Sequence, residues 1–271
     1  MYLEHFGLKE KPFEPTIDPK YIWVSKENAR FLREFKQAFL KLEGYLMLSG
    51  DVGSGKTAFM SCFLKLIENN ALSAVIWDPA VGPLEFLNLL ALGFRIDKVF
   101  ETKTEFLDHY KSLVENAYLN HLKLLIVIDE AQNLNLEPVR ELNRLMSIKI
   151  YGRKPVNVLF LVQRKKKKSP PPINQNSCNT KVIAHHHMQP LSPEDTSGLI
   201  KHRLKVAGTD MQIFSEEAMH EIFKFSAGNP RLINLICDRA LLTGYVAGTT
   251  MISNSIVSEC ANELKISKLA P

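Results

Sequence analysis

The sequence predicts an α/β protein with a three-layer core, built on a mostly parallel sheet, and a small helical domain that follows the core in the sequence. Short apolar runs alternate with amphipathic stretches from residue 45 to about residue 189, a rhythm typical of parallel strands joined by helices. After residue 190 the patterns are helical only, at about 193–207, 215–226, 230–246 and 254–265. We therefore expect an α/β core over residues 1–189 and a helical domain over residues 190–271.

Local sequence signals indicate where two helices of the predicted helical domain begin. Ser192 precedes Pro193 and Glu194, and Ser215 precedes two glutamates. A serine at the N-cap, followed by proline or by acidic residues in the first turn, is typical of a helix start.

Composition restricts the class of protein. Hydrophobic residues make up 45% of the chain, which is enough for a buried core. The net charge of +5 equals the charge of the five consecutive cations at 164–168, so the remainder is balanced and gives little support to a nucleic-acid partner. The four cysteines lie far apart without a CxxC pair, and no signal peptide or membrane span is recognisable. We expect a reduced, cytoplasmic chain without direct membrane insertion.

The strongest motif is GDVGSGKT at residues 50–57, which follows an apolar run and opens a helical pattern. It fits the GxxxxGK[ST] phosphate-binding loop, in which glycines let successive backbone amides point at phosphate oxygens. Lys56 would reach the outer phosphates, and the Thr57 hydroxyl would bind Mg²⁺. An ordinary glycine turn would leave a lysine beside a positive helix end unexplained. The expected nucleotide-binding residues of this loop are Gly50, Asp51, Val52, Gly53, Ser54, Gly55, Lys56, Thr57 and Ala58.

Two carboxylates follow a second apolar strand in LLIVIDEAQNL. The carboxyl ends of parallel strands face the ligand crevice, so Asp129 and Glu130 are expected near the phosphates. Adjacent residues on a strand point to opposite sides, which would let Asp129 hold Mg²⁺ while Glu130 orients and deprotonates water. By itself a strand ending in two acids is weak evidence; after a phosphate-binding loop it becomes strong.

On these motifs the chain resembles the AAA+ ATPases, and more narrowly the ExeA or GspA-like ATPases of secretion pathways. The resemblance rests on MYLEHFGLKEKPFEPTIDPKYIWVS, GDVGSGKT, VIDEAQNL, PLSPEDTSGLIKHRLKVAG and GNPRLINLICDRALLTGY. It implies a P-loop core followed by a helical lid. It also implies that the opening segment lies near the adenine, with Phe13 and Ile22 as candidates for the apolar wall, although core packing would explain them equally well.

The GNPR motif opens one of the predicted helices. Asn229 reads as an N-cap and Pro230 as the first helical residue, which puts the cation of Arg231 in the first turn, against the helix dipole. The resemblance implies that Arg231 touches the bound nucleotide as a sensor. The alternative is that Arg231 pairs with Glu216 or Glu217.

Residues 163–181, QRKKKKSPPPINQNSCNTK, depart from the family pattern. The glycine that the family places before Gln163 is absent, and Lys181 stands where the family has an arginine finger. Lysine lacks the planar fork of arginine, so hydrolysis would be impaired while binding survives. The tract could also be a docking peptide of the polyproline type, or the product of a compensated frameshift.

Three consecutive histidines follow the tract. On a strand, only His185 and His187 would share a face. No cysteine or carboxylate stands at ligand spacing, so a polar strand is favoured over a zinc site.

The expected function is that of an ATPase that binds ATP and Mg²⁺ and hydrolyses ATP in a homo-oligomer, in support of a secretion or pilus-type apparatus. Association with the inner membrane would then depend on a partner protein. Two alternatives stay open: a DNA-associated helper in transposition or replication, and a nucleotide-binding switch that hydrolyses weakly.

Overall fold

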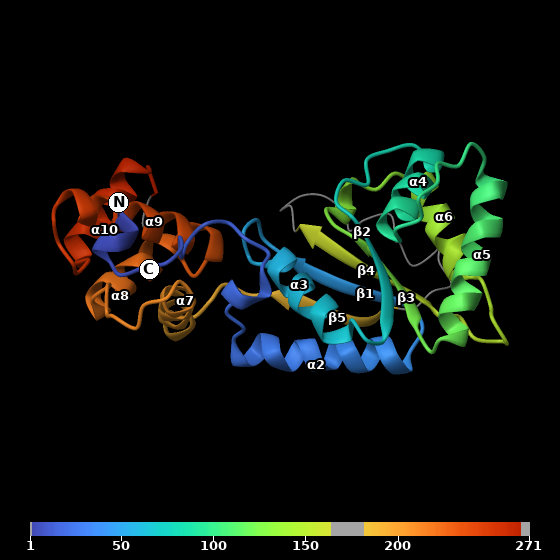
Figure 1. The fold of residues 1–271 in the computed structure, drawn as a ribbon, viewed down its shortest axis with the longest axis horizontal. Coiled ribbons are helices and arrows are strands. Elements are labelled where there is room, and N and C mark those ends of the chain that lie inside the picture. The colour runs from blue at the N-terminus through green and yellow to red at the C-terminus, as the bar shows by residue number, and fades with distance from the viewer. Residues whose placement is uncertain (1, 164–181, 267–271) are drawn as a thin grey trace. The chain divides into compact units, whose positions relative to one another are not determined.

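A computed structural model describes residues 2–163 and 182–266. Its contacts divide the chain into two compact units, coloured along the chain in Figure 1. The sheet unit comprises Arg30–Val52 and Cys62–Met188. The helical unit comprises Met1–Ala29, Gly53–Ser61 and Gln189–Pro271. Each unit has its own hydrophobic core.

The sheet has five strands in the order β2-β3-β4-β1-β5, and every adjacent pair is parallel (Figure 1). Parallel neighbours need crossover connections, and helices supply most of them here. This result confirms the predicted α/β class. The strands are β1 (Tyr45–Gly50), β2 (Ala71–Ile76), β3 (Lys123–Ile128), β4 (Val156–Gln163) and β5 (Val182–Met188).

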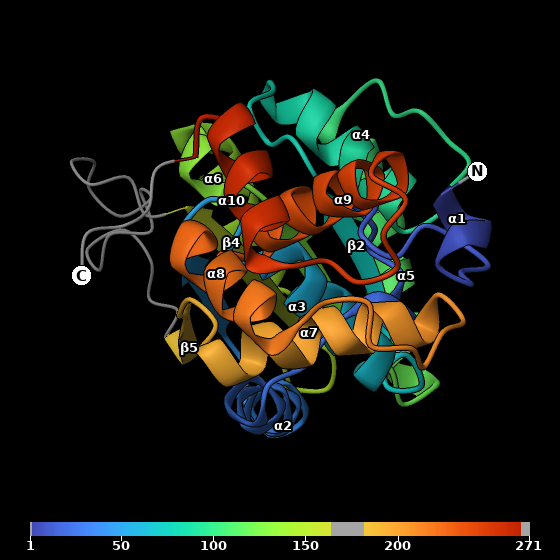
Figure 2. The ribbon, with the colours of Figure 1, turned by 90° about the vertical axis from the view of Figure 1, so that its left-hand side faces the viewer.

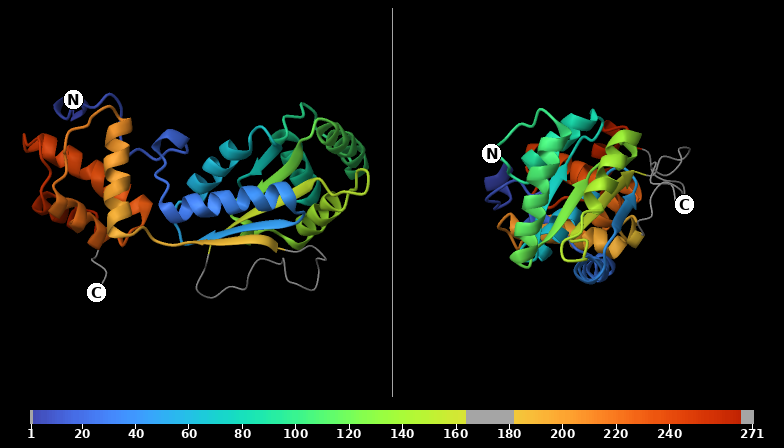
Figure 3. Two further views of the ribbon diagram at one scale, coloured as in Figure 1. Left: turned by 90° about the horizontal axis from the view of Figure 1, so that it is seen from below. Right: turned by 90° about the vertical axis from the view of Figure 1, so that its right-hand side faces the viewer.

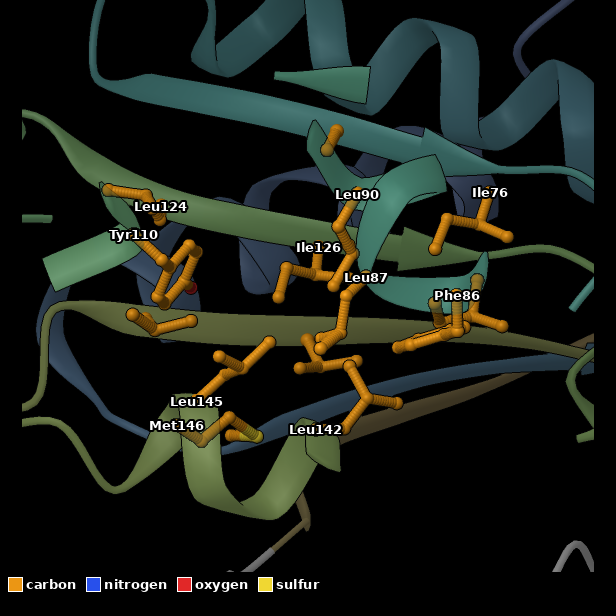
Figure 4. Close-up of a cluster of buried hydrophobic side chains, with 14 of the residues drawn as sticks. Ile76, Phe86, Leu87, Leu90, Tyr110, Leu124, Ile126, Leu142, Leu145 and Met146 are labelled. Carbon is orange, nitrogen blue, oxygen red and sulfur yellow. The ribbon is translucent and has the colours of Figure 1, made fainter. Parts of the chain in front are cut away.

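One face of the sheet packs against α4 (Pro83–Gly93), α5 (Lys103–Leu119) and α6 (Leu136–Met146). The close-up in Figure 4 shows Ile126 of β3 among Leu87 and Leu90 of α4 and Leu142 of α6. All four side chains are at most 1% exposed. Burying a side chain of this size stabilises the fold by about 1.5–3 kcal/mol.

The other face is covered by α2 (Lys26–Lys41) and α3 (Lys56–Ile67), and α2 runs alongside β1 and β5 in Figure 3. Phe35 and Phe39 of α2 pack edge-to-face on Phe63 of α3. At the carboxyl end of α2, the carbonyl oxygen of Phe39 accepts hydrogen bonds from Lys123 Nζ at 2.9 Å and Asn157 Nδ2 at 3.2 Å. These bonds satisfy a helix-end carbonyl and tie α2 to β3 and β4.

The helical unit contains α7 (Pro193–Val206), α8 (Glu216–Ser226), α9 (Pro230–Val246) and α10 (Asn254–Glu263), which are labelled in Figure 2. The helix starts agree with the sequence. Ser192 accepts a hydrogen bond from the Asp195 amide, and Ser215 accepts one from the Ala218 amide. Such N-caps are each worth about 1 kcal/mol.

The opening residues belong to the helical unit rather than to the sheet, which differs from the expected core over residues 1–189. They include α1 (Tyr2–His5) and the short 3-10 helix η1 (Pro19–Tyr21). Phe6, Phe13 and Tyr21 are at most 5% exposed and lie in the core formed with α7 to α10. The guanidinium of Arg203 in α7 fastens this segment by donating to the Pro12 and Glu14 carbonyl oxygens, each at 3.1 Å.

Within the described ranges, no helix combines the length and apolar character needed to cross a membrane.

Candidate functional site

The GDVGSGKT loop begins at the last residue of β1, Gly50, and runs into α3, whose first residue is Lys56. Gly53 and Gly55 have φ angles of +76° and +93°. This region disfavours residues that carry a Cβ, so the two glycines permit the curl of the loop. The backbone geometry is what a phosphate-binding loop at a helix N-terminus requires.

Two polar side chains of the loop are buried in a way that suits an anion. Ser54 and Lys56 are each 7% exposed. The Ser54 hydroxyl has no hydrogen-bond partner within the described residues, although a buried polar atom left unpaired costs about 1–3 kcal/mol. A phosphate oxygen would satisfy the hydroxyl, and the ammonium group of Lys56 would balance its charge. These residues fit a nucleotide phosphate.

The structure brings Arg231 to this loop. A Cβ built on Gly53 would lie 2.6 Å from Asn229 Oδ1 and 2.8 Å from Arg231 Cβ, so only glycine fits. Asn229 is the N-cap of α9, and its Oδ1 accepts hydrogen bonds from the amides of Arg231 at 3.0 Å and Leu232 at 3.4 Å. The start of α9, with its positive dipole end, therefore lies directly against the second glycine of the motif.

The alternative partners of Arg231 are otherwise engaged. Glu216 forms an ion pair with Lys201 at 2.9 Å. Hydrogen bonds from its own backbone amide and from Ser215 lower the pKa of Glu217. Arg231 itself is exposed and forms no ion pair with any side chain that the structure describes. The placement favours the expected contact with an anionic ligand.

Asp129 and Glu130 follow β3, but their separation does not come from strand alternation as the sequence suggested. The strand ends at Ile128, and Glu130 takes a left-handed conformation with φ 47° and ψ 40°. Asp129 stays on the sheet because its amide donates to the Ile76 carbonyl oxygen at 2.8 Å. Asp129 is 8% exposed, and its carboxylate accepts from the Glu130 amide at 2.8 Å. The left-handed turn thus gives the two carboxylates different surroundings.

A residue that the sequence did not single out completes this edge of the sheet. Gln132, in the short 3-10 helix η2 (Ala131–Asn133), donates from its side-chain amide to Glu130 Oε2. Its Oε1 accepts from the Gln163 amide at 2.9 Å. Gln163 is the last residue of β4 and is paired in register with Gly50. Glu130 and Gln163, which lie far apart in sequence, are joined through one glutamine.

The histidines behave as a polar edge strand. Ser49 Oγ lies 2.9 Å from His185 Nε2 and 3.0 Å from His187 Nδ1. His186 points to the opposite face and stacks on Phe31 with ring centroids 3.6 Å apart. Burial, assisted by the neighbouring histidines, lowers the pKa of His186 to about 4. Across residues 2–163 and 182–266, no group of three or more metal-ligating side chains occurs.

The remaining candidate site residues are Phe13, Ile22 and Lys181. Phe13 is 2% exposed and packs edge-to-face on Phe214, so it is a core residue of the helical unit. Ile22 is half-buried and caps η1. Lys181 and the Lys/Pro tract at 164–181 lie outside the described residues, so the expected loss of an arginine finger stays a prediction.

Comparison with known proteins finds relatives that are similar to this chain in sequence. A model of an AAA domain matches residues 40–167. General secretion pathway protein A of Aeromonas hydrophila is 29% identical over 270 residues, which cover 97% of this chain. The chain spans about half, 48%, of the length of that relative. An uncharacterized HTH-type transcriptional regulator of Methanocaldococcus jannaschii is 34% identical over 84 residues, 30% of this chain and 20% of that protein.

Solved structures share the fold at low sequence identity. The ORC2 protein of Aeropyrum pernix, solved in ADPNP and ADP complexes, superposes with a TM-score of 0.76 at 18% identity, covering 97% of this chain and 74% of the other. Cdc6p of Pyrobaculum aerophilum gives a TM-score of 0.69 at 18% identity, with 93% and 70% covered. The RuvB Holliday junction branch migration motor of Thermotoga maritima gives 0.61 at 16% identity, with 90% and 71% covered.

The parallel sheet and these similarities define the fold: the chain has the same fold as the ORC2, Cdc6p and RuvB structures, and residues 40–167 match a model of an AAA domain. Over 97% of its length the chain is similar in sequence to general secretion pathway protein A, which confirms the resemblance that the motifs indicate.

Proposed function

We propose that the protein binds ATP with Mg²⁺ and hydrolyses the terminal phosphate. The observation that carries this proposal is the phosphate loop, with Gly53 and Gly55 at positive φ and with the buried hydroxyl of Ser54, which has no hydrogen-bond partner among the described residues. The backbone amides of residues 50–58, the ammonium group of Lys56 and the guanidinium of Arg231 would hold the phosphates. These groups are all positive or hydrogen-bond donors, as a polyphosphate requires.

The hydroxyl of Thr57 and the carboxylate of Asp129 are the hard oxygen ligands that Mg²⁺ prefers, and they would hold it directly or through water. A bound Mg²⁺ would neutralise charge on the phosphate oxygens. Glu130 would accept a proton from the attacking water. A positioned carboxylate base typically contributes a factor of about 10²–10⁴ to the rate.

The proposal includes a biological setting. The name of general secretion pathway protein A supports a role in a secretion or pilus-type apparatus. In this proposal the protein acts as a nucleotide-dependent homo-oligomer on the cytoplasmic side, and contact with the inner membrane depends on a partner. Residues 190–271, which include Arg231, would act as a helical lid and report nucleotide state.

A DNA-associated role is the second candidate, because the structural neighbours include RuvB and a Drosophila ORC bound to DNA. The balanced charge of the chain outside residues 164–168 counts against it. A weakly hydrolysing switch is the third, since Lys181 stands at the expected arginine position.

One experiment separates the three candidates: the ATPase rate of the purified protein across a concentration series, with and without DNA. The first candidate predicts a specific rate that rises with protein concentration and ignores DNA. Stimulation by DNA that falls steeply with added salt would support the second. A rate near zero at every concentration, beside normal ATP binding, would support the switch.

A further inference from the structure

The carboxyl end of β4 leaves a backbone group that the sheet does not pair. On the β3 side, the register runs only to Ile128 opposite Phe160. β4 continues to Gln163, so its last residues extend beyond the end of β3. The side-chain carbonyl of Gln132 accepts from the Gln163 amide at 2.9 Å and thus extends the hydrogen-bond ladder past the strand.

The other end of the same side chain holds Glu130. The Gln132 amide nitrogen donates to Glu130 Oε2. The structure gives Glu130 Oε1 no protein partner among the residues that it describes. One carboxylate oxygen is therefore tethered and the other is left for a ligand. Because Glu130 sits in a left-handed turn, where the chain after β3 leaves the sheet, the backbone alone does not determine its direction.

We propose that Gln132 is a positioning residue: it fixes the carboxylate of Glu130 relative to the end of β4, and so presents the free oxygen for proton transfer. This inference rests on the proposed ATPase function. Gln163 is paired with Gly50, the first residue of the phosphate loop, so the glutamine places the base in register with the start of that loop. A glutamine has the length and the two-ended polarity for this role, since it is both donor and acceptor.

Two substitutions separate the two ends of the bridge. Gln132→Met keeps the size of the side chain and removes both hydrogen bonds. Gln132→Glu keeps an acceptor for the Gln163 amide but offers no donor to Glu130 and adds a like charge. The control is Asn133→Ala, because Asn133 lies on the same short helix and is exposed.

The first measurement is steady-state ATP hydrolysis by the full chain. Both Gln132 variants should lower kcat by about ten- to hundredfold, the effect of a misplaced reacting group, and leave KM within about twofold. Asn133→Ala should match the parent. Parent-like kcat in either Gln132 variant would overturn the positioning role, and so would a loss that appears in KM alone.

The second measurement is hydrogen exchange of the Gln163 amide, which needs no activity. Exchange should be at least about tenfold faster in Gln132→Met and close to the parent in Gln132→Glu and Asn133→Ala. Unchanged protection in Gln132→Met would contradict the bridge itself. A parent that binds ATP but never hydrolyses it would overturn the proposed function, and the positioning role with it. An active parent beside active Gln132 variants would overturn the positioning role alone.

Discussion

Replacing Gly53 with alanine tests whether the phosphate loop and the start of α9 touch as the structure has them. At φ +76° an alanine is strained by about 1–2 kcal/mol. Its Cβ would also approach Asn229 Oδ1 to 2.6 Å and Arg231 Cβ to 2.8 Å, distances that force the neighbours to move. Displacing an N-cap asparagine costs about 0.5–2 kcal/mol. We expect Gly53→Ala to lower the free energy of unfolding of the helical unit by about 1.5–4 kcal/mol.

The helical unit supplies a matched control. Gly248 has φ +67°, and a Cβ built on it meets nothing within 4 Å. Gly248→Ala therefore carries the backbone strain without the clash, and should cost about 1–2 kcal/mol. The excess cost of Gly53→Ala measures the contact with α9.

The assay is urea unfolding followed by the fluorescence of a single tryptophan. The chain has two tryptophans, Trp23 in the helical unit and Trp77 in the sheet unit. In a Trp77→Phe background, Trp23 reports the helical unit alone, since it packs closely on Gly198 of α7. Costs for Gly53→Ala and Gly248→Ala that agree within about 0.5 kcal/mol would refute the packing of the loop against Asn229 and Arg231.

Three further predictions concern the site and its surroundings. Glu130→Gln should bind ATP as the parent does and lose turnover by at least about a hundredfold, because the amide cannot accept the proton of water; equal turnover would overturn the base assignment. Arg231→Ala should weaken ATP binding by roughly ten- to a hundredfold in titrations, because a charge-assisted hydrogen bond is lost. Arg239→Ala is the control on the same helix: Arg239 pairs with Glu263 at 2.7 Å, and its replacement should leave ATP binding unchanged. Stability should fall as pH drops from about 6.5 towards 4, by on the order of 2–3 kcal/mol, because the unfolded chain protonates His186 at higher pH than the folded protein, where the pKa is about 4. Unfolding curves of His186→Phe should lack that component, and an identical pH dependence in this variant would contradict the buried, neutral imidazole.

The fold could be predicted wherever a local pattern has a single structural solution. Apolar runs bounded by turn residues predicted β1 to β4, and Ser192, Ser215 and Asn229 predicted the starts of α7, α8 and α9. In each case one side-chain oxygen next to backbone amides decides the local structure. The phosphate loop could be predicted for the same reason, because the spacing of its glycines determines the curl of the backbone.

The rest depends on contacts between distant segments. An apolar residue such as Phe13 is predicted to be buried, but the sequence does not indicate which core it joins. The opening segment was therefore expected to pack with the sheet. Gln132 carries no sequence signal, since its second partner is Gln163, 31 residues away. The left-handed turn at Glu130 could not be predicted from the sequence either. A non-glycine residue rarely adopts that conformation, and only the surrounding structure enforces it.

The central claim is that residues 50–57 hold the phosphates of a nucleotide. Equilibrium binding of ATP, in the presence of Mg²⁺, to the unaltered protein and to Lys56→Ala tests it most directly. The account predicts saturable binding of one nucleotide per chain, and its loss in Lys56→Ala at unchanged stability. Equal affinity in the two proteins, or no binding by the unaltered protein, would contradict it.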